Sequence, residues 1–266
     1  MKTTKTIQTN TNKKAVLPTI TAIALGFAVQ AVAQTTYLGN GATGFGGPVG
    51  TGSLTVSDTA SSLTFTLNRG AGAMNDDLVL YLDTQSGGFP DTTAFQDNAD
   101  GGRTAISGFN AGNPSQTVAT FATAGLLPDY AVSIENSFIG VFQLVPGGNG
   151  SLNYLFGQGQ SGNNLDSSYS ITLNAAQMSQ IGLTAGSGQT FNFVGSLIST
   201  TAYRANETIG ASITVSGDGA GNAGFNNPQT FLGADSYTLQ TVPEPASLAL
   251  FGLSGLMTSL LIRRRK

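Results

Sequence analysis

Three aspartates in one Asn- and Gly-containing stretch are the residues best spaced to bind a metal ion. Asp91, Asp97 and Asp100 lie close together in the chain, with Asn98 and Gly101 beside them. Oxygen ligands at such spacing suit a hard cation such as calcium, which also accepts carbonyl and water ligands. The stretch lacks the full spacing and the terminal Glu of an EF-hand. It therefore predicts either a calcium site or a solvated turn, in which Asp and Asn favour the backbone conformation.

Acidic residues near predicted strand ends suggest a second chemistry, glycoside hydrolysis by a pair of carboxylates. Glu135 and Glu207 are the only glutamates ahead of the C-terminal tail, and Asp83 and Asp129 lie near strand ends. No spacing in the sequence brings any two of them to the required separation. Glu135 also precedes Asn136-Ser137, a predicted hairpin turn where an exposed charge is ordinary. We therefore expect a protein that is not an enzyme.

The residue inventory excludes several other mechanisms. The chain has no His and no Cys, which removes the usual base of serine hydrolases, thiolate chemistry and disulfides. Three G-x-G-x-x-G matches begin at Gly39, Gly157 and Gly219, but none precedes a predicted helix. Such matches are expected from composition, because 36 of the 266 residues are Gly. We predict no cofactor other than the calcium considered above.

Charge is segregated along the chain. Basic residues gather at the two ends, and only Arg69, Arg103 and Arg204 lie between them. Of the 14 acidic residues all but Glu244 lie between these basic ends and before the tail, so this part carries 13 acidic and 3 basic side chains, a net charge of about −10. Such a surface repels phosphates, which argues against a nucleic-acid partner.

Short runs of alternating apolar and polar residues predict about eleven strands. Gly, Asn, Asp or Pro bound each run, which indicates an all-β antiparallel β-sandwich, jelly-roll-like, as a single domain over residues 34–240. The runs are Leu54–Val56, Leu63–Leu67, Leu78–Leu82, Thr117–Phe121, Tyr130–Ile134, Phe138–Leu144, Leu152–Phe156, Tyr169–Leu173, Phe191–Ile198, Ser212–Val215 and Tyr237–Leu239. One short helix is predicted over Asn174–Ile181, where a capping Asn precedes helix-forming residues and Gly182 follows.

The first 33 residues read as a Sec signal peptide. Lysines precede an apolar stretch, predicted as a signal helix, from Ala15 to Val29, and the small residues Ala31 and Ala33 occupy the positions that signal peptidase requires. We predict cleavage after Ala33. An uncleaved N-terminal membrane helix is the alternative.

Residues 241–266 combine a proline-rich hinge, an apolar stretch and a basic end. Val242, Pro243, Glu244 and Pro245 lead into 17 uncharged residues, Ala246 to Ile262, which as a transmembrane helix would span about 25 Å. Prolines keep the preceding backbone extended, so the hinge should be accessible to a protease. The chain ends in four cations that should stay in the cytoplasm and stop transfer: Arg263, Arg264, Arg265 and Lys266.

This order of hinge, apolar stretch and arginine cluster resembles the PEP-CTERM sorting signal of Gram-negative bacteria. The resemblance implies recognition by exosortase, a membrane transpeptidase that processes the tail near Pro-Glu-Pro. It also implies transient anchoring in the inner membrane, then release to the cell surface or extracellular matrix, commonly with exopolysaccharide or biofilm. A plain membrane anchor is the alternative.

The ectodomain is similar in outline to DOMON-like and other carbohydrate-binding sandwiches, through Asp76–Thr84 and the loop after it. Our first hypothesis is a structural or adhesive surface protein. The second is a carbohydrate-binding module using exposed aromatic residues, and the third is a carboxylate-dependent glycoside hydrolase. The aromatic residues considered for the second are Tyr81, Phe89, Phe95 and Tyr130.

Overall fold

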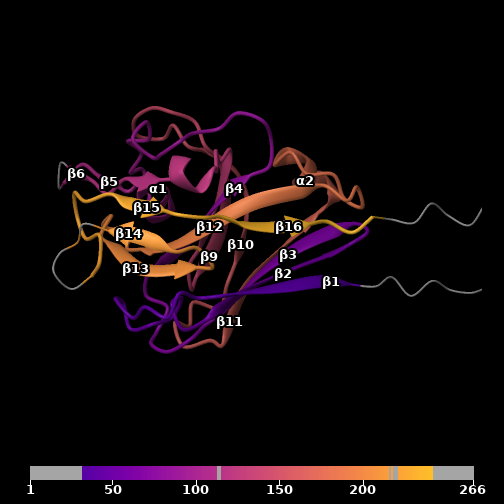
Figure 1. The fold of residues 1–266 in the computed structure, drawn as a ribbon, viewed down its shortest axis with the longest axis horizontal. Helices are drawn as coiled ribbons and strands as arrows, with labels where there is room; N and C mark the ends of the chain where they lie inside the picture. Colours follow the sequence, from indigo (N-terminus) through magenta and orange to yellow (C-terminus); the bar gives the residue numbers. More distant parts are fainter. Residues whose placement is uncertain (1–31, 113–114, 216, 218–220, 242–266) are drawn as a thin grey trace, which may run out of the picture. The chain divides into compact units, whose positions relative to one another are not determined.

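The computed structural model describes residues 32–112, 115–215, 217 and 221–241, and these form mostly β-sheet with little helix (Figure 1). This confirms the all-β prediction. The signal peptide up to residue 31, the sorting hinge and the predicted transmembrane stretch lie outside the described residues. Within the described part, no helix has the length and apolar character needed to cross a membrane.

The smaller of the two main sheets has four antiparallel strands in the order β1-β2-β3-β11. Its inner face is apolar, because Leu54 and Val56 alternate with Ser and Thr along β2, and Phe65 does so on β3. The outer face carries Ser, Thr, Asn and Gln in cross-strand rows, one of which contains Thr36, Thr55, Thr66 and Ser170. The strands are β1 (Ala33–Leu38), β2 (Ser53–Thr59), β3 (Ser62–Asn68) and β11 (Ser168–Asn174).

The larger sheet has the order β10-β9-β8-β4-β12-β13, and β16 also pairs with β12. Its strand β4 is buried on both faces: Leu80 packs toward the smaller sheet, whereas Tyr81 packs into a second apolar cluster. A strand that is buried on both faces has an almost continuous run of apolar residues in its sequence. The strands are β4 (Asp77–Asp83), β8 (Tyr130–Ile134), β9 (Phe138–Gln143), β10 (Asn153–Gly159), β12 (Thr190–Ile198), β13 (Arg204–Ile209) and β16 (Asp235–Thr238).

A layer of loops, short strands and helical turns covers the other face of the larger sheet. Phe121 and Phe231 stack there at 5.8 Å, and the Tyr81 hydroxyl donates to the Ile106 carbonyl at 2.7 Å. This layer closes the second cluster. Its elements are α1 (Gly101–Ser107), η1 (Ala122–Ala124), β5 (Phe109–Asn110), β6 (Ser115–Gln116), β7 (Ala119–Thr120), β14 (Ile213–Val215) and β15 (Gln229–Phe231).

The helical content differs from the prediction of one short helix. The predicted one is present as α2 (Ala175–Gln180), with Asn174 and Gln177 forming a reciprocal capping box. The second, α1, was not predicted and begins directly after the stretch where a calcium loop or turn was predicted. Asp100 caps its N-terminus by accepting from the Arg103 amide, and Gly108 ends it at φ 65°, so a seven-residue helix fits between them.

The strand order also differs from expectation, and five strands were not predicted: β1, β5, β6, β13 and β15. Strands β1-β2-β3 and β8-β9-β10 are neighbours in both sequence and space, so much of each sheet is a meander rather than the jelly-roll-like arrangement predicted. Strands β1 and β13 were missed because their sequences, AQTTYL and RANETI, lack a clear apolar alternation. Backbone pairing with β2 and β12 positions them instead.

The two described chain ends lie together at one end of the strands (Figure 1). Ala33 pairs with Asp58, and the Tyr237 hydroxyl donates to the Ala33 carbonyl at 3.0 Å. In the larger sheet this end holds Asp83, because Asn192 pairs with Asp83 and Thr190 pairs with β16. The turn at Glu135 is at the opposite end of β4, about 20 Å away for six residue steps.

Candidate functional site

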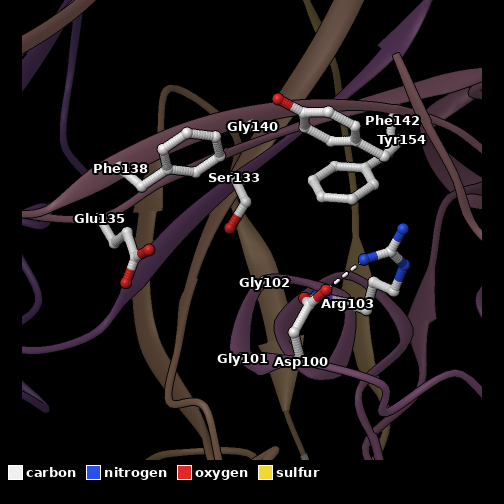
Figure 2. A pocket seen from close by; sticks show the side chains of 10 residues that line it. All are labelled: Asp100, Gly101, Gly102, Arg103, Ser133, Glu135, Phe138, Gly140, Phe142 and Tyr154. Carbon is white, nitrogen blue, oxygen red and sulfur yellow. Dashed lines mark hydrogen bonds and ion pairs between the residues drawn. The ribbon is translucent and has the colours of Figure 1, made fainter. Parts of the chain in front are cut away.

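A surface cleft of about 480 Å³ lies beside helix α1, on the face of the larger sheet turned away from the smaller sheet. Figure 2 shows the rings of Phe138 and Tyr154 on one side, the carboxylates of Glu135 and Asp100 on the other, and the Ser133 hydroxyl between them. The volume is within the range of ligand-binding pockets. The full lining is Asp100, Gly101, Gly102, Arg103, Ser133, Glu135, Phe138, Gly140, Phe142 and Tyr154.

Strand pairing brings the cleft residues together from three strands. Ser133 on β8 pairs with Gly140 on β9, and Phe142 on β9 pairs with Tyr154 on β10. The lack of a side chain at Gly140 leaves room for the neighbouring ring, since a Cβ there would lie 2.7 Å from Phe142 Cε2. The strands thus form a hollow with an aromatic wall.

The aromatic wall differs from the set that the sequence suggested. Phe138 and Tyr154 are 36% and 45% exposed, and the Tyr154 ring lies 5.5 Å from that of Phe142. Exposed rings in a cleft supply flat apolar surface with a polar rim. The four aromatic residues that the sequence suggested for carbohydrate binding do not form an exposed group. Tyr81, Phe95 and Tyr130 are buried, and Phe89 packs on Phe95. Cross-strand register, which the sequence does not display, selects the exposed rings.

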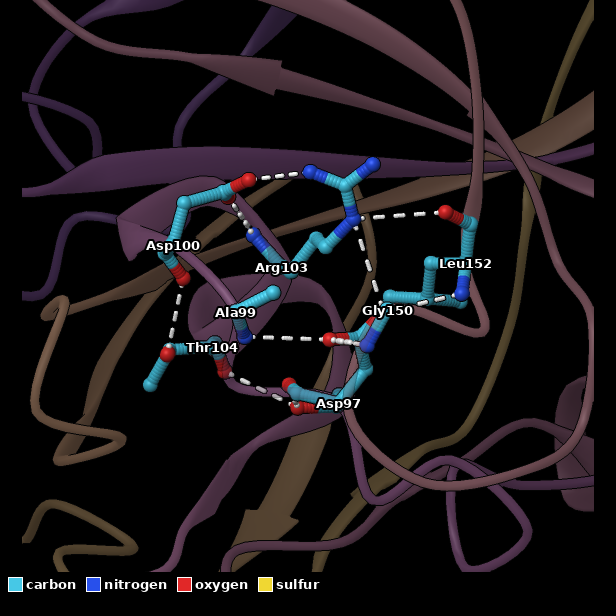
Figure 3. Close-up of polar contacts among 8 residues, drawn as sticks. Asp97, Ala99, Asp100, Arg103, Thr104, Gly150 and Leu152 are labelled. Atoms are coloured by element: carbon cyan, nitrogen blue, oxygen red, sulfur yellow. Dashed lines mark hydrogen bonds and ion pairs between the residues drawn. The ribbon is translucent and has the colours of Figure 1, made fainter.

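Arg103 forms one side of the cleft and is fully engaged (Figure 3). Its guanidinium pairs with Asp100, lies 3.5 Å from Asp97 Oδ2 through Nε, and stacks 5.1 Å from the centre of the Phe142 ring. Two carboxylates and an aromatic face therefore share a single cation. The orientation of the guanidinium is fixed from several directions.

The three aspartates of the predicted calcium site have protein partners. Asp97 is fully buried and accepts from the amides of Gly150 and Leu152 at 2.7 and 2.8 Å, while Asp91 accepts from the Thr93 amide. Among the described residues no group of three or more acidic side chains is arranged to hold a metal ion. Calcium binding stays a prediction. A rise in melting temperature when calcium follows EDTA treatment, abolished by Asp100→Asn, would support it.

One carboxylate, Asp77, is buried behind the lining residue Ser133, and another, Glu135, lines the cleft. Asp77 is 1% exposed and accepts from the Ser133 hydroxyl at 3.0 Å. Burial first, and then the charge of Glu135, raise the pKa of Asp77 to about 7. Burial and the nearby Asp100 likewise raise the pKa of Glu135. The cleft therefore has a surplus of acidic groups that disfavour one another's ionisation.

The other carboxylates considered for hydrolysis have structural contacts. Glu207 is fully buried and accepts from four backbone amides of the loop between β1 and β2, called here the Gly-rich loop. These are the amides of Phe45, Gly47, Val49 and Gly50. Asp83 accepts from the Leu127 amide, and Asp129 accepts from the Gln85 amide. Of this set only Glu135 lines the cleft.

The described residues define an all-β protein with an aromatic-walled acidic cleft at the end opposite its exit to the C-terminal tail. Comparison with protein families identifies the tail itself, since the model of the PEP-CTERM protein-sorting motif matches residues 241–266. The chain therefore carries a PEP-CTERM sorting motif, which confirms the resemblance drawn from the hinge and the basic end. No curated protein and no solved structure matches the chain, so the similarity to DOMON-like sandwiches stays a prediction.

The motif implies processing by exosortase and a secreted, cell-surface or membrane-anchored route. It covers only the last 26 residues and carries no information on what the ectodomain binds.

Proposed function

We propose that this chain is a non-enzymatic surface or extracellular-matrix protein that, after sorting by exosortase, associates with exopolysaccharide through the cleft beside α1. The observation that carries the proposal is the pair of exposed rings, Phe138 and Tyr154, facing polar groups across a hollow of about 480 Å³. Sugar rings present apolar faces to aromatic side chains and hydroxyls to carboxylates, and this cleft offers both surfaces.

The position of the cleft supports an outward-facing role. The described chain ends at Thr241, beside β16 and the N-terminal end of β12. Ser133 and Glu135 lie at the other end of the same sheet, where Leu78 pairs with Ile134. A domain held at its C-terminal exit would thus present the cleft away from its attachment point.

Binding without cleavage is favoured by the contacts of the cleft carboxylates. A glycosidase needs one carboxyl to donate a proton and another to act as base or nucleophile. Asp100, the other carboxylate that lines the cleft, accepts from the Arg103 amide at 2.9 Å and also pairs with its guanidinium. Both functions of Asp100 are structural, capping α1 and holding Arg103.

The test is retention of the purified full chain, in detergent, on a panel of immobilised polysaccharides. We expect retention on at least one, lost in Phe138→Ala and Tyr154→Ala. The matched control is Phe225→Ala, since Phe225 is 37% exposed and does not line the cleft. Equal retention of all three variants, or release of reducing sugar from any retained polysaccharide, would overturn the proposal.

A further inference from the structure

The cleft carries more negative charge than the chain's own cations neutralise. Asp100 and Glu135 line it, Asp97 is buried beside Arg103, and Asp77 is buried behind Ser133. Among the described residues, the ion pairs are those of Arg103 with Asp97 and Asp100. Glu135 is thus left without a cationic partner in this part of the molecule.

No other cation of the ectodomain is in a position to fill that role. Between the basic ends the chain has only three arginines. Arg69 donates to the carbonyls of Asp166 and Leu165 in the loop before β11, and Arg204 is fully buried and donates to Ser196. Glu135 is therefore a partly exposed carboxylate without a cationic partner among the described residues, at the place where a ligand would enter.

The aromatic wall opposite Glu135 adds a second attraction for a positive charge. Arg103 already uses the Phe142 ring in this way, at 5.1 Å. The rings of Phe138 and Tyr154, with centroids 6.4 Å apart, lie across the cleft from Glu135 and Asp100 (Figure 2). A ligand ammonium between these surfaces would gain both an ion pair and a cation–π contact, each stronger where water is displaced.

We infer that the cleft is selective for a cationic saccharide, an amino sugar whose free ammonium lies between Glu135 and the rings of Phe138 and Tyr154. This inference rests on the proposed saccharide binding and adds the chemical class of the sugar. The volume of about 480 Å³ favours a sugar ring over a bare ammonium group, for which it is far too large. The Ser133 hydroxyl, which donates to Asp77, is left to accept a hydrogen bond from the ligand.

The test compares glucosamine oligomers with N-acetylglucosamine oligomers of equal length, which have the same rings but no charge. Calorimetric titration uses the full chain in detergent, in slightly acidic buffer where the amines are protonated. We expect the glucosamine oligomer to bind at least about tenfold more tightly, and this preference to shrink with added salt. Glu135→Gln should remove most of the preference, because the ammonium then loses its ion pair.

Asp83→Asn is the matched control, because it removes one negative charge at the opposite end of β4 and should leave the preference unchanged. Equal or tighter binding of the N-acetylated oligomer would overturn the charge selectivity and leave the proposed function standing. If neither oligomer and no neutral polysaccharide binds the chain, the proposed function itself is overturned. Binding of spermidine or a lysine peptide as tightly as glucosamine would show a general cation site and overturn the assignment to a sugar.

Discussion

The Tyr237 hydroxyl donates a 2.7 Å hydrogen bond to Asp58 Oδ1, and the Gln240 amide donates to Asp58 Oδ2 at 2.8 Å. One buried carboxylate on β2 thus holds the last described strand just before the sorting motif. Asp58 also pairs with Ala33, so it joins the two ends of the described chain. This contact holds Gln240, the residue directly before the matched motif, against β2.

Tyr237→Phe should therefore destabilise the domain by about 1–3 kcal/mol, because it leaves a buried carboxylate oxygen without a donor. Urea unfolding of the full chain in detergent measures the change. Tyr154→Phe, at an exposed position, is the control and should cost well under 1 kcal/mol. Equal stability of the two variants would contradict a role for the Asp58 contact.

The stability of the domain should fall as pH rises from about 4 to about 7. Asp77 has its pKa raised to about 7 in the folded chain, against about 4 in an unfolded one, so the folded state binds the proton more tightly. The contribution of this proton to stability is fully present below the pKa of the unfolded chain. It is lost as the pH rises through the pKa of the folded chain. Asp76 and Glu135, whose pKa values are also raised by burial, act in the same direction.

Asp77→Asn should flatten this pH dependence, since Asn does not titrate and still accepts a hydrogen bond from Ser133. Melting temperatures from acid to neutral pH provide the measurement. Asp83→Asn serves as the control and should keep the slope of the native protein. A slope that Asp77→Asn leaves intact would assign the effect to other carboxyls.

Glu207→Gln should loosen the Gly-rich loop between β1 and β2. The carboxylate accepts from four backbone amides, whereas a Gln side chain has one acceptor oxygen, so two buried amides lose their partner. A cost of about 3 kcal/mol is expected. Amide exchange at Gly47 and Val49 should accelerate more than exchange in β4, and uniform acceleration would argue against a local role.

Gly102→Leu should fold and yet fail to bind saccharide. A Cβ at Gly102 would lie 3.6 Å from Ser133 Oγ and 3.7 Å from Asp100 Oδ1, an ordinary contact distance that points the new side chain into the cleft. Helix propensity would favour the substitution by up to about 1 kcal/mol. The control is Gly148→Leu, where a Cβ has no neighbour within 4 Å. Column retention equal to that of the native chain would place the ligand elsewhere.

Replacing Pro243, Glu244 and Pro245 by Ala should prevent processing by exosortase. The prolines keep the hinge out of a helix, and without them the apolar stretch could extend through it. We expect the full-length chain to accumulate in the membrane fraction on immunoblots, as in cells lacking exosortase. Ser259→Ala, within the apolar stretch, should be processed normally. Normal release of the triple variant would contradict recognition of this motif.

Local patterns in the sequence were sufficient for most of the longer strands, the capped helix and the sorting signal. Apolar and polar residues alternate along β2, β3 and β11 because every second side chain faces the core. The Asn174 side chain caps a helix whose partner residue, Gln177, lies three positions further on. The sorting motif is likewise read within 26 consecutive residues. Such features depend on neighbours in the chain, which a single sequence displays directly.

Tertiary structure alone decided the cleft and the roles of its acids. Phe138, Tyr154 and Asp100 meet through the pairing of β9 with β10 and the packing of α1 on the larger sheet. The same packing buries Tyr81 and Phe95, and commits Glu207 to the Gly-rich loop. Register and layer packing join residues far apart in sequence, and no local period specifies them. The sequence therefore determined that this protein is exported and β-rich, and the fold determined where it can bind.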